Sequence, residues 1–176
     1  DGSGWTAVAT ATTPLATSGR TMVFDPVLQR ILYYDSSRTW AYDGRTWNNL
    51  QPPVSPPPRV GSAMAVDQGR RRVLLFGGNQ YRNDLWEWNG ATWRQLATTS
   101  GTTPQGRWGH AMSPDVDGDG VLVFGGGGSQ LALRGETWRM NSTTPASIAP
   151  YGSACRGSSG APELRAIDGF RPWLGQ

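Results

Sequence analysis

The chain has 176 residues, and its content of 37% hydrophobic and 10% aromatic residues is enough to build a core, which excludes a disordered chain. Its 24 glycines and 13 prolines predict many turns and few long helices, because both residues interrupt helical periodicity. No apolar stretch approaches the roughly 18 residues of a membrane span. The formal net charge is +3, every basic residue is an arginine, and the run at 70–72 is expected on the solvated face of a hairpin rather than on nucleic acid.

Similar units recur along the chain. The aligned segments are TMVFDPVLQRILYYD from Thr21, AMAVDQGRRRVLLFGG from Ala63 and AMSPDVDGDGVLVFGG from Ala111, and in each a methionine precedes an aromatic residue by the same interval. A loop and a tryptophan-rich stretch follow each segment: TWAYDGRTW, LWEWNGATW or TWRMN. One further tryptophan marks each unit, at Trp5, Trp47 and Trp93. Because these residues recur in register, we expect them to pack between structural units.

Each unit is expected to form four short strands. The methionine segment alternates small and large residues, as a pleated strand does. The second strand, ILYY, VLLF or VLVF, is a continuous apolar run that suits burial on both faces. The third strand carries Trp40, Trp86 or Trp138, and the fourth follows turn signals such as DGRT and NGAT. One such sheet cannot shelter so many aromatic side chains, so neighbouring sheets should stack face to face in an all-β fold.

The units resemble the Kelch repeat of β-propellers over residues 1–141. The resemblance lies in Arg59 and Gly61, or Arg107, Gly109 and His110, followed by methionine, an apolar strand, a Gly-Gly pair and spaced tryptophans. It implies a Kelch-type segment of about three four-stranded blades, an incomplete part of a ring that commonly has six or seven. It also implies an extracellular or cell-envelope protein of bacterial origin.

The first unit departs from the pattern, with Thr17 at the arginine position and Asp35-Ser36 in place of the Gly-Gly pair. The third unit is expected to end after its third strand. Three blades do not close a ring, so we expect the remaining blades in a longer parent chain. In the alternative, the N-terminal strand completes the last blade of a second copy, and two chains form a six-bladed ring. Residues 142–176 are expected to be a Gly/Ser/Pro-rich linker or the start of a C-terminal β module, in which Cys155 has no disulfide partner within this chain.

Two polar features of the sequence are candidate sites. Asp115, Asp117, Asp119 and Gly120 match the first half of a calcium loop, but the bidentate glutamate that such a loop needs is missing. We therefore favour a turn over a calcium site and expect no cofactor. His110 is the chain's only histidine, and a structural role or a contact at the rim is favoured because no second histidine or thiol lies nearby. For the same reason this segment cannot assemble a copper site like that of galactose oxidase.

The nonrepeating loops are the expected place for recognition, because variable loops on a rigid repeat usually carry binding residues. The resemblance implies that two sets of these loops emerge on one face. The candidate ligand-binding residues are Arg59, Asn79, Tyr81, Arg82, Arg107, Trp108, His110, Gln130 and Arg134. We expect a noncatalytic interaction module that binds a protein or a carbohydrate. The alternative is the propeller part of a larger extracellular oxidase, epimerase or hydrolase whose catalytic residues lie outside this segment.

Overall fold

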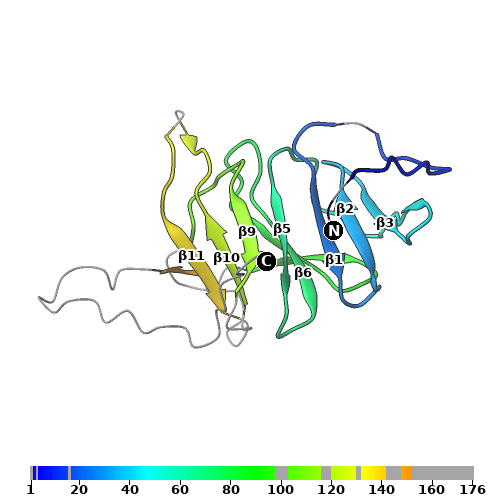
Figure 1. Cartoon of the computed structure of the whole chain (residues 1–176). Coiled ribbons are helices and arrows are strands. Elements are labelled where there is room, and N and C mark those ends of the chain that lie inside the picture. The colour runs from blue at the N-terminus through cyan, green and yellow to red at the C-terminus, as the bar shows by residue number, and fades with distance from the viewer. Residues whose placement is uncertain are drawn as a thin grey trace, which may run out of the picture.

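The computed structural model describes residues 2, 4–15, 17–97, 103–115, 120–129, 132–141 and 148–151. These residues form three antiparallel four-stranded sheets, in each of which the strands pair in chain order (Figure 1). The first sheet contains β1 (Thr21–Asp25), β2 (Arg30–Tyr34), β3 (Thr39–Tyr42) and β4 (Trp47–Asn49). The second contains β5 (Ala63–Asp67), β6 (Arg72–Phe76), β7 (Leu85–Trp88) and β8 (Trp93–Leu96). The third contains β9 (Ala111–Pro114), β10 (Gly120–Phe124), β11 (Thr137–Asn141) and β12 (Ile148–Tyr151). The all-β prediction is confirmed.

The third sheet differs from the sequence expectation at its outer edge. We expected the third unit to end after its third strand, but β12 pairs with β11 in the fourth position, with Thr137 opposite Tyr151. An edge strand is held by main-chain hydrogen bonds, so it forms there without the turn and tryptophan of the other units. This strand lies beyond the predicted domain boundary at residue 141. Cys155 lies outside the described residues.

In the first and second units, the aspartate that ends the first strand closes the following hairpin. The Asp25 carboxylate accepts a 2.7 Å hydrogen bond from the amide of Val27. The Asp67 carboxylate accepts one of 3.1 Å from the amide of Arg70. Aspartate favours such turns because its short side chain reaches the amides two and three residues ahead. The repeat therefore preserves a turn-forming residue where each chain direction reverses.

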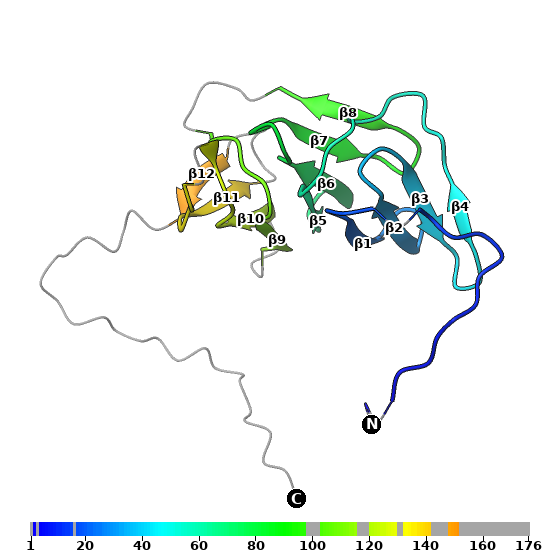
Figure 2. The ribbon, with the colours of Figure 1, turned by 90° about the horizontal axis from the view of Figure 1, so that it is seen from above.

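The three sheets are arranged as a fan. The first strands β1, β5 and β9 lie along one side of the molecule, with β5 in contact with both β1 and β9. The fourth strands β4, β8 and β12 spread apart (Figure 2). This arrangement is propeller-like, and it leaves the second sheet covered on both faces.

Two apolar cores fill the spaces between the sheets. The first–second interface buries Leu32, Tyr34, Met64, Val66, Val73, Leu75, Trp86, Trp88 and Trp93. The second–third interface buries Ala65, Leu74, Phe76, Leu85, Val121, Val123, Trp138 and Met140. Neighbouring residues of β5 and β6 point to opposite interfaces, which is why these strands read as continuous apolar runs. Each large apolar side chain buried in this way stabilises the fold by roughly 1.5–3 kcal/mol.

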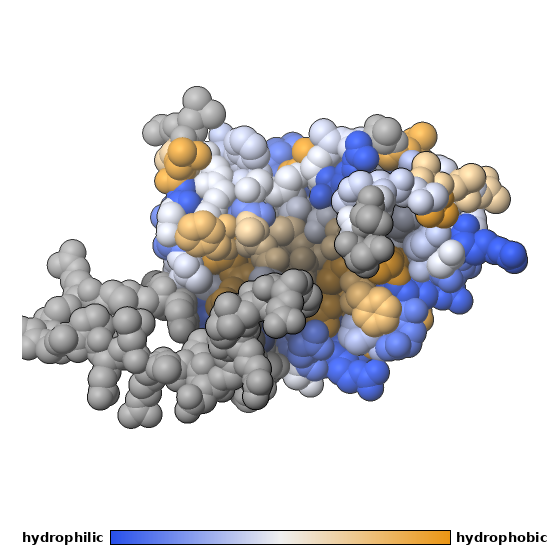
Figure 3. Space-filling view, in the orientation of Figure 1, coloured by the Kyte–Doolittle hydropathy of each residue, from blue (hydrophilic) through white to orange (hydrophobic). Residues whose placement is uncertain are grey.

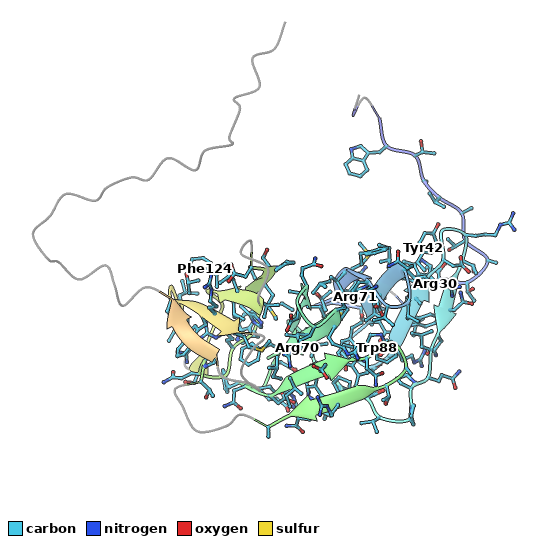
Figure 4. The ribbon with its side chains drawn as sticks, turned by 90° about the horizontal axis from the view of Figure 1, so that it is seen from below. Arg30, Tyr42, Arg70, Arg71, Trp88 and Phe124 are labelled. Carbon is cyan, nitrogen blue, oxygen red and sulfur yellow. The ribbon has the colours of Figure 1, made fainter. Side chains whose placement is uncertain are left out.

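The recurring tryptophans do not all reach an interface. Trp86 and Trp93 are buried between the first and second sheets, as predicted. Trp88 lies in the same interface (Figure 4) and donates a 2.7 Å hydrogen bond from its indole to Asp25 of the first sheet. Trp5, by contrast, is fully exposed, and the N-terminal strand that was expected to follow it does not form in residues 4–15. The described part of the chain provides no neighbouring strand with which this segment pairs.

Candidate functional site

Two loop sets meet on one side of the fan. One set is the β6–β7 loop (77–84), and the other is the segment before β9, of which residues 103–110 are described. The amide of Gly78 donates a 2.8 Å hydrogen bond to the carbonyl of Arg107, and the Arg107 amide donates one of 3.2 Å to the carbonyl of Arg82. The backbones of the two loops are thereby joined. We call this side, together with the loop at 125–136 in its described part, the loop face.

Arg59, a candidate ligand-binding residue, is fully buried beneath the loop face. Its guanidinium donates two hydrogen bonds of 2.7 Å to the two carboxylate oxygens of Asp84. It also donates to the carbonyls of Gly77 (3.1 Å) and Pro57 (3.0 Å) and lies over the ring of Trp86. A guanidinium bound in this two-pronged way has few donors left for a ligand. Arg59 therefore holds the loop in place.

Arg107 repeats this arrangement in the next unit. It is also fully buried, and its guanidinium donates hydrogen bonds to the carboxylate of Glu136 (2.6 Å) and to the carbonyls of Gly125 (3.0 Å) and Gln105 (3.1 Å). Neither this residue nor Arg59 reaches the surface where we expected a ligand. The two arginines recur because each one clamps the loop that follows the second strand of its own unit.

The carboxylates of both clamps are ionised at neutral pH. Burial by itself raises the pKa of Asp84, but hydrogen bonds from Arg59 and Trp86 outweigh it and the net pKa falls below the ordinary value. For Glu136, burial likewise raises the pKa, but hydrogen bonds from its own backbone amide and from Arg107 outweigh this, and the net pKa falls below the ordinary value. The ion pairs are therefore intact at pH 7.

Sequence reasoning missed these two carboxylates as part of the repeat. Asp84 precedes Trp86 by the same interval as Glu136 precedes Trp138, so an acidic residue recurs before the third-strand tryptophan. This signal could have been combined with the recurring arginine, because an arginine expected in a core needs a carboxylate partner.

The first unit confirms the logic of the clamp by lacking both halves of it. Where the other units have arginine it has Thr17, and where they have the acidic residue it has Arg38. Asp35, which replaces the first glycine of the Gly-Gly pair, takes over one function of the clamp by accepting a 2.8 Å hydrogen bond from the indole of Trp40. The hydroxyl of Thr17 donates to the Asp35 carbonyl at 2.7 Å. The departures in this unit thus compensate one another.

The tip of the β6–β7 loop presents a tyrosine to solvent. Asn79 is tied to the preceding loop by two hydrogen bonds, from its amide to the carbonyl of Val60 (2.7 Å) and from the Val60 amide to its side-chain oxygen (3.0 Å). Gln80 and Tyr81 then adopt positive φ angles of 61° and 54°. This conformation costs non-glycine residues roughly 1–2 kcal/mol each. It leaves the Tyr81 side chain 51% exposed, next to the partly exposed Arg82.

An apolar cavity of about 520 Å³ opens on the third sheet. Trp108, Phe124, Leu133 and Arg134 line it together with a row of glycines. Trp108 is 44% exposed, and its backbone exchanges two hydrogen bonds of 3.0 and 2.8 Å with Gly127. An exposed indole on a fixed backbone beside a cation suits the recognition of a flat apolar or sugar surface.

His110 lies inside the second–third interface rather than on the loop face. Its imidazole is buried and contacts the ring of Phe76 edge to face, with ring centroids 5.5 Å apart. Among the described protein residues, neither ring nitrogen has a hydrogen-bond partner. Burial, with the nearby charge of Arg107, lowers the pKa of His110 to about 4. The imidazole is therefore neutral at pH 7.

The calcium candidates are only partly described. The Asp115 carboxylate forms an ion pair with Arg139 at 2.5 Å, while Asp117 and Asp119 lie outside the described residues. Within the described ranges, no three acidic, histidine or cysteine side chains converge as metal ligands would. The expectation of a turn rather than a calcium site stays a prediction. Gln130, a candidate on the loop face, also lies outside the described residues.

The basic run at the β5–β6 hairpin lies on the side of the fan opposite the loop face (Figure 4). Arg70 forms ion pairs with Asp67 (2.8 Å) and Glu87 (3.5 Å). Arg71 donates a 3.0 Å hydrogen bond to the carbonyl of Pro26 in the hairpin of the first sheet. At least two of the three arginines thus bind other parts of the protein.

No model of a known protein family matches this chain. In the portion of the chain that the structure describes, no helix has the length and apolarity to cross a membrane.

Proposed function

We propose that this chain is a segment of a Kelch-type β-propeller and acts as a noncatalytic interaction module that binds a protein or a carbohydrate through its loop face. The fan of three sheets and the recurring arginine–carboxylate clamps support the Kelch-type assignment. The observation that carries the binding function is the exposure of Tyr81 and Trp108 on adjacent loops whose backbones are hydrogen-bonded to each other.

The loops of the loop face are preorganised for binding. Loops that are already fixed lose little conformational freedom on binding, so the contact energy of exposed aromatic side chains is retained as affinity. Arg59 and Arg107 contribute indirectly by clamping the loops from below. The recognition surface therefore consists of Asn79, Tyr81, Arg82, Trp108 and Arg134. The alternative of a larger extracellular enzyme stays a prediction.

The test combines a ligand screen with matched substitutions. The chain is screened against an array of immobilised glycans and against a panel of purified extracellular matrix and cell-surface proteins. For any ligand found, Tyr81→Ala and Trp108→Ala are each expected to weaken binding roughly tenfold, because central aromatic contacts dominate recognition surfaces. Trp5→Ala is the matched control, since Trp5 is an exposed indole of the N-terminal segment and not one of the recognition residues. Unchanged affinity in both loop variants would reject the assignment of this face.

A further inference from the structure

The outer face of the third sheet exposes side chains that the other sheets bury at the same repeat positions. Phe124 is 54% exposed, whereas the aligned Tyr34 and Phe76 are 0% and 1% exposed. Leu122 is partly exposed, whereas the aligned Leu74 is fully buried. The next sheet covers this face in the first two units, whereas no sheet among the described residues covers it in the third. We call Ala111, Ser113, Leu122 and Phe124 the open face of the third sheet.

The first sheet shows the complementary pattern on its own outer face. Met22 is 61% exposed, whereas the aligned Met64 is 5% exposed in the first–second interface. Phe24 is 49% exposed, whereas the aligned Val66 is 5% exposed. We call Met22, Phe24 and Ile31 the open face of the first sheet. A single chain therefore carries both halves of a sheet interface, one at each end of the fan, and apolar side chains also gather over the first strands (Figure 3).

A ladder of main-chain hydrogen bonds shows how one sheet is placed on the next. The amide of Gly61 donates to the carbonyl of Gly19 (3.4 Å), and the amide of Gly109 donates to the carbonyl of Gly61 (2.8 Å). The three glycines share φ angles of 71°, 73° and 64°. A Cβ on Gly19 or Gly61 would press on the following unit, but one on Gly109 would meet nothing within 4 Å. The third unit therefore leaves room beside Gly109 for one more segment like 17–20 or 107–110.

The cavity beside Phe124 lies where a further segment of this kind would pack against Gly109. In the second–third interface the corresponding corner is filled by residues 107–110, whose Arg107 carbonyl and His110 imidazole lie against Gly77. The aligned Gly125 touches no such segment. Residues 17–20, TSGR, occupy the position of residues 107–110 in the repeat.

We infer that a second copy of this chain covers the open faces, with the first sheet of each copy stacked on the third sheet of the other. The first and third sheets extend to opposite sides of the second sheet, so both open faces look toward the same side of the molecule (Figure 2). Two copies related by a twofold axis can therefore form both contacts at once and close a ring of six sheets. Gly19 of each copy would then extend the glycine ladder at Gly109 of the other.

The pairing occurs between faces and without exchange of strands. The exchange that the sequence suggested would place the N-terminal strand in the fourth position of the third sheet. That position is occupied by β12 of the same chain. The inference does not rest on the proposed function, because it is argued from the exposure of the two open faces. The second copy would nevertheless cover the cavity that Trp108 and Arg134 of the recognition surface line.

The test measures the mass of the 176-residue chain by sedimentation equilibrium over a range of concentrations. The wild type is expected at twice the mass of one chain. Phe24→Glu and Phe124→Glu should each raise the dimer dissociation constant about 100-fold or more, because a twofold dimer contains each substituted contact twice. Val54→Glu is the matched control: Val54 is 49% exposed like Phe24 but lies in the β4–β5 loop, so the dimer should persist.

A mixing experiment distinguishes this pairing from other dimers. A mixture of the Phe24→Glu and Phe124→Glu variants restores one intact interface, so it should form a heterodimer although each variant alone is a monomer. Circular dichroism verifies that both variants fold, which their half-exposed positions favour. A wild type that stays monomeric at every concentration, a dimer that survives either substitution, or a mixture that stays monomeric would overturn the inference.

Discussion

The two sheet interfaces use the same strand positions but different polar contacts. In the first–second interface, the Asp25 carboxylate accepts a 2.7 Å hydrogen bond from the indole of Trp88 across the interface. In the second–third interface, Met140 replaces that tryptophan and offers no donor, and the Asp67 carboxylate binds the Arg70 guanidinium of its own hairpin at 2.8 Å. The repeat therefore preserves the carboxylate, while the neighbouring sheet decides what it holds.

The largest effect is expected from breaking the cross-sheet contact with Asp25→Ala. The substitution leaves the buried indole of Trp88 and the amide of Val27 without their acceptor. Unpaired buried donors of this kind cost about 3 kcal/mol of unfolding free energy together. Urea unfolding followed by tryptophan fluorescence measures the loss.

Asp43→Ala is the matched control for this substitution. Asp43 accepts hydrogen bonds of 2.9 Å from the amides of Arg45 and Thr46 in the same turn geometry, but its hairpin is exposed. Its loss of stability should be clearly smaller. Equal losses would show that the turn, and not the interface, stabilises the fold through Asp25.

A smaller difference is expected between Gly77→Ala and Gly125→Ala. Gly77 is contacted by the segment before β9, whereas no corresponding segment contacts Gly125. Both glycines have similar positive φ angles, 66° and 69°, so the backbone strain of the substitution is shared. A Cβ at Gly77 would lie 2.6 Å from the Arg107 carbonyl, whereas one at Gly125 would lie 3.4 Å from its nearest neighbour. Gly77→Ala should therefore destabilise the monomer by about 2 kcal/mol more.

These two variants are best compared at a concentration where the chain is monomeric. Thermal and urea unfolding should agree on the order of the two. If both lose the same stability, the segment before β9 does not pack against the second sheet as closely as the structure shows.

The smallest effect on stability at neutral pH is expected from substitution of His110, a titratable side chain of the second–third interface. Its pKa falls from 6.5 to about 4 on folding, so the unfolded chain takes up the proton first as the pH drops. Stability should therefore fall by about 2 kcal/mol between pH 7 and pH 5. His110→Leu should remove this part of the pH dependence.

The pKa itself is open to direct measurement, because the chain has one histidine. The imidazole signal in a proton NMR titration should move near pH 4. A titration midpoint close to 6.5 would mean that the ring is solvated and that Arg107 does not act on it.

Most of the fold could be predicted from the sequence. The periodic methionines, the apolar runs and the spaced tryptophans located eleven of the twelve strands and their grouping into units, because each carries a packing requirement that recurs in register. The N-terminal strand that Trp5 predicted does not form in the described residues 4–15. The twelfth strand, β12, was missed because its segment lacks the repeat pattern. Main-chain pairing at a sheet edge requires no particular side chains.

The candidate site was predictable only in part. The adjacency of the two loop sets was expected, and the structure joins them through the backbone of Arg107. The burial of Arg59 and Arg107 was not expected, because their partners Asp84 and Glu136 lie more than 20 residues away in the chain. Whether an arginine faces a ligand or a carboxylate depends on that distant partner.

The sequence by itself determined the repeating unit: which residues form strands, which face each side chain takes, and where the chain turns. These are consequences of local periodicity and of residue types suited to turns. Only the tertiary structure decided which aspartate meets an indole, which arginines are buried, and which sheet faces stay open. Those outcomes depend on the neighbour that each sheet meets, and a neighbour in space is not encoded in the pattern of any single unit.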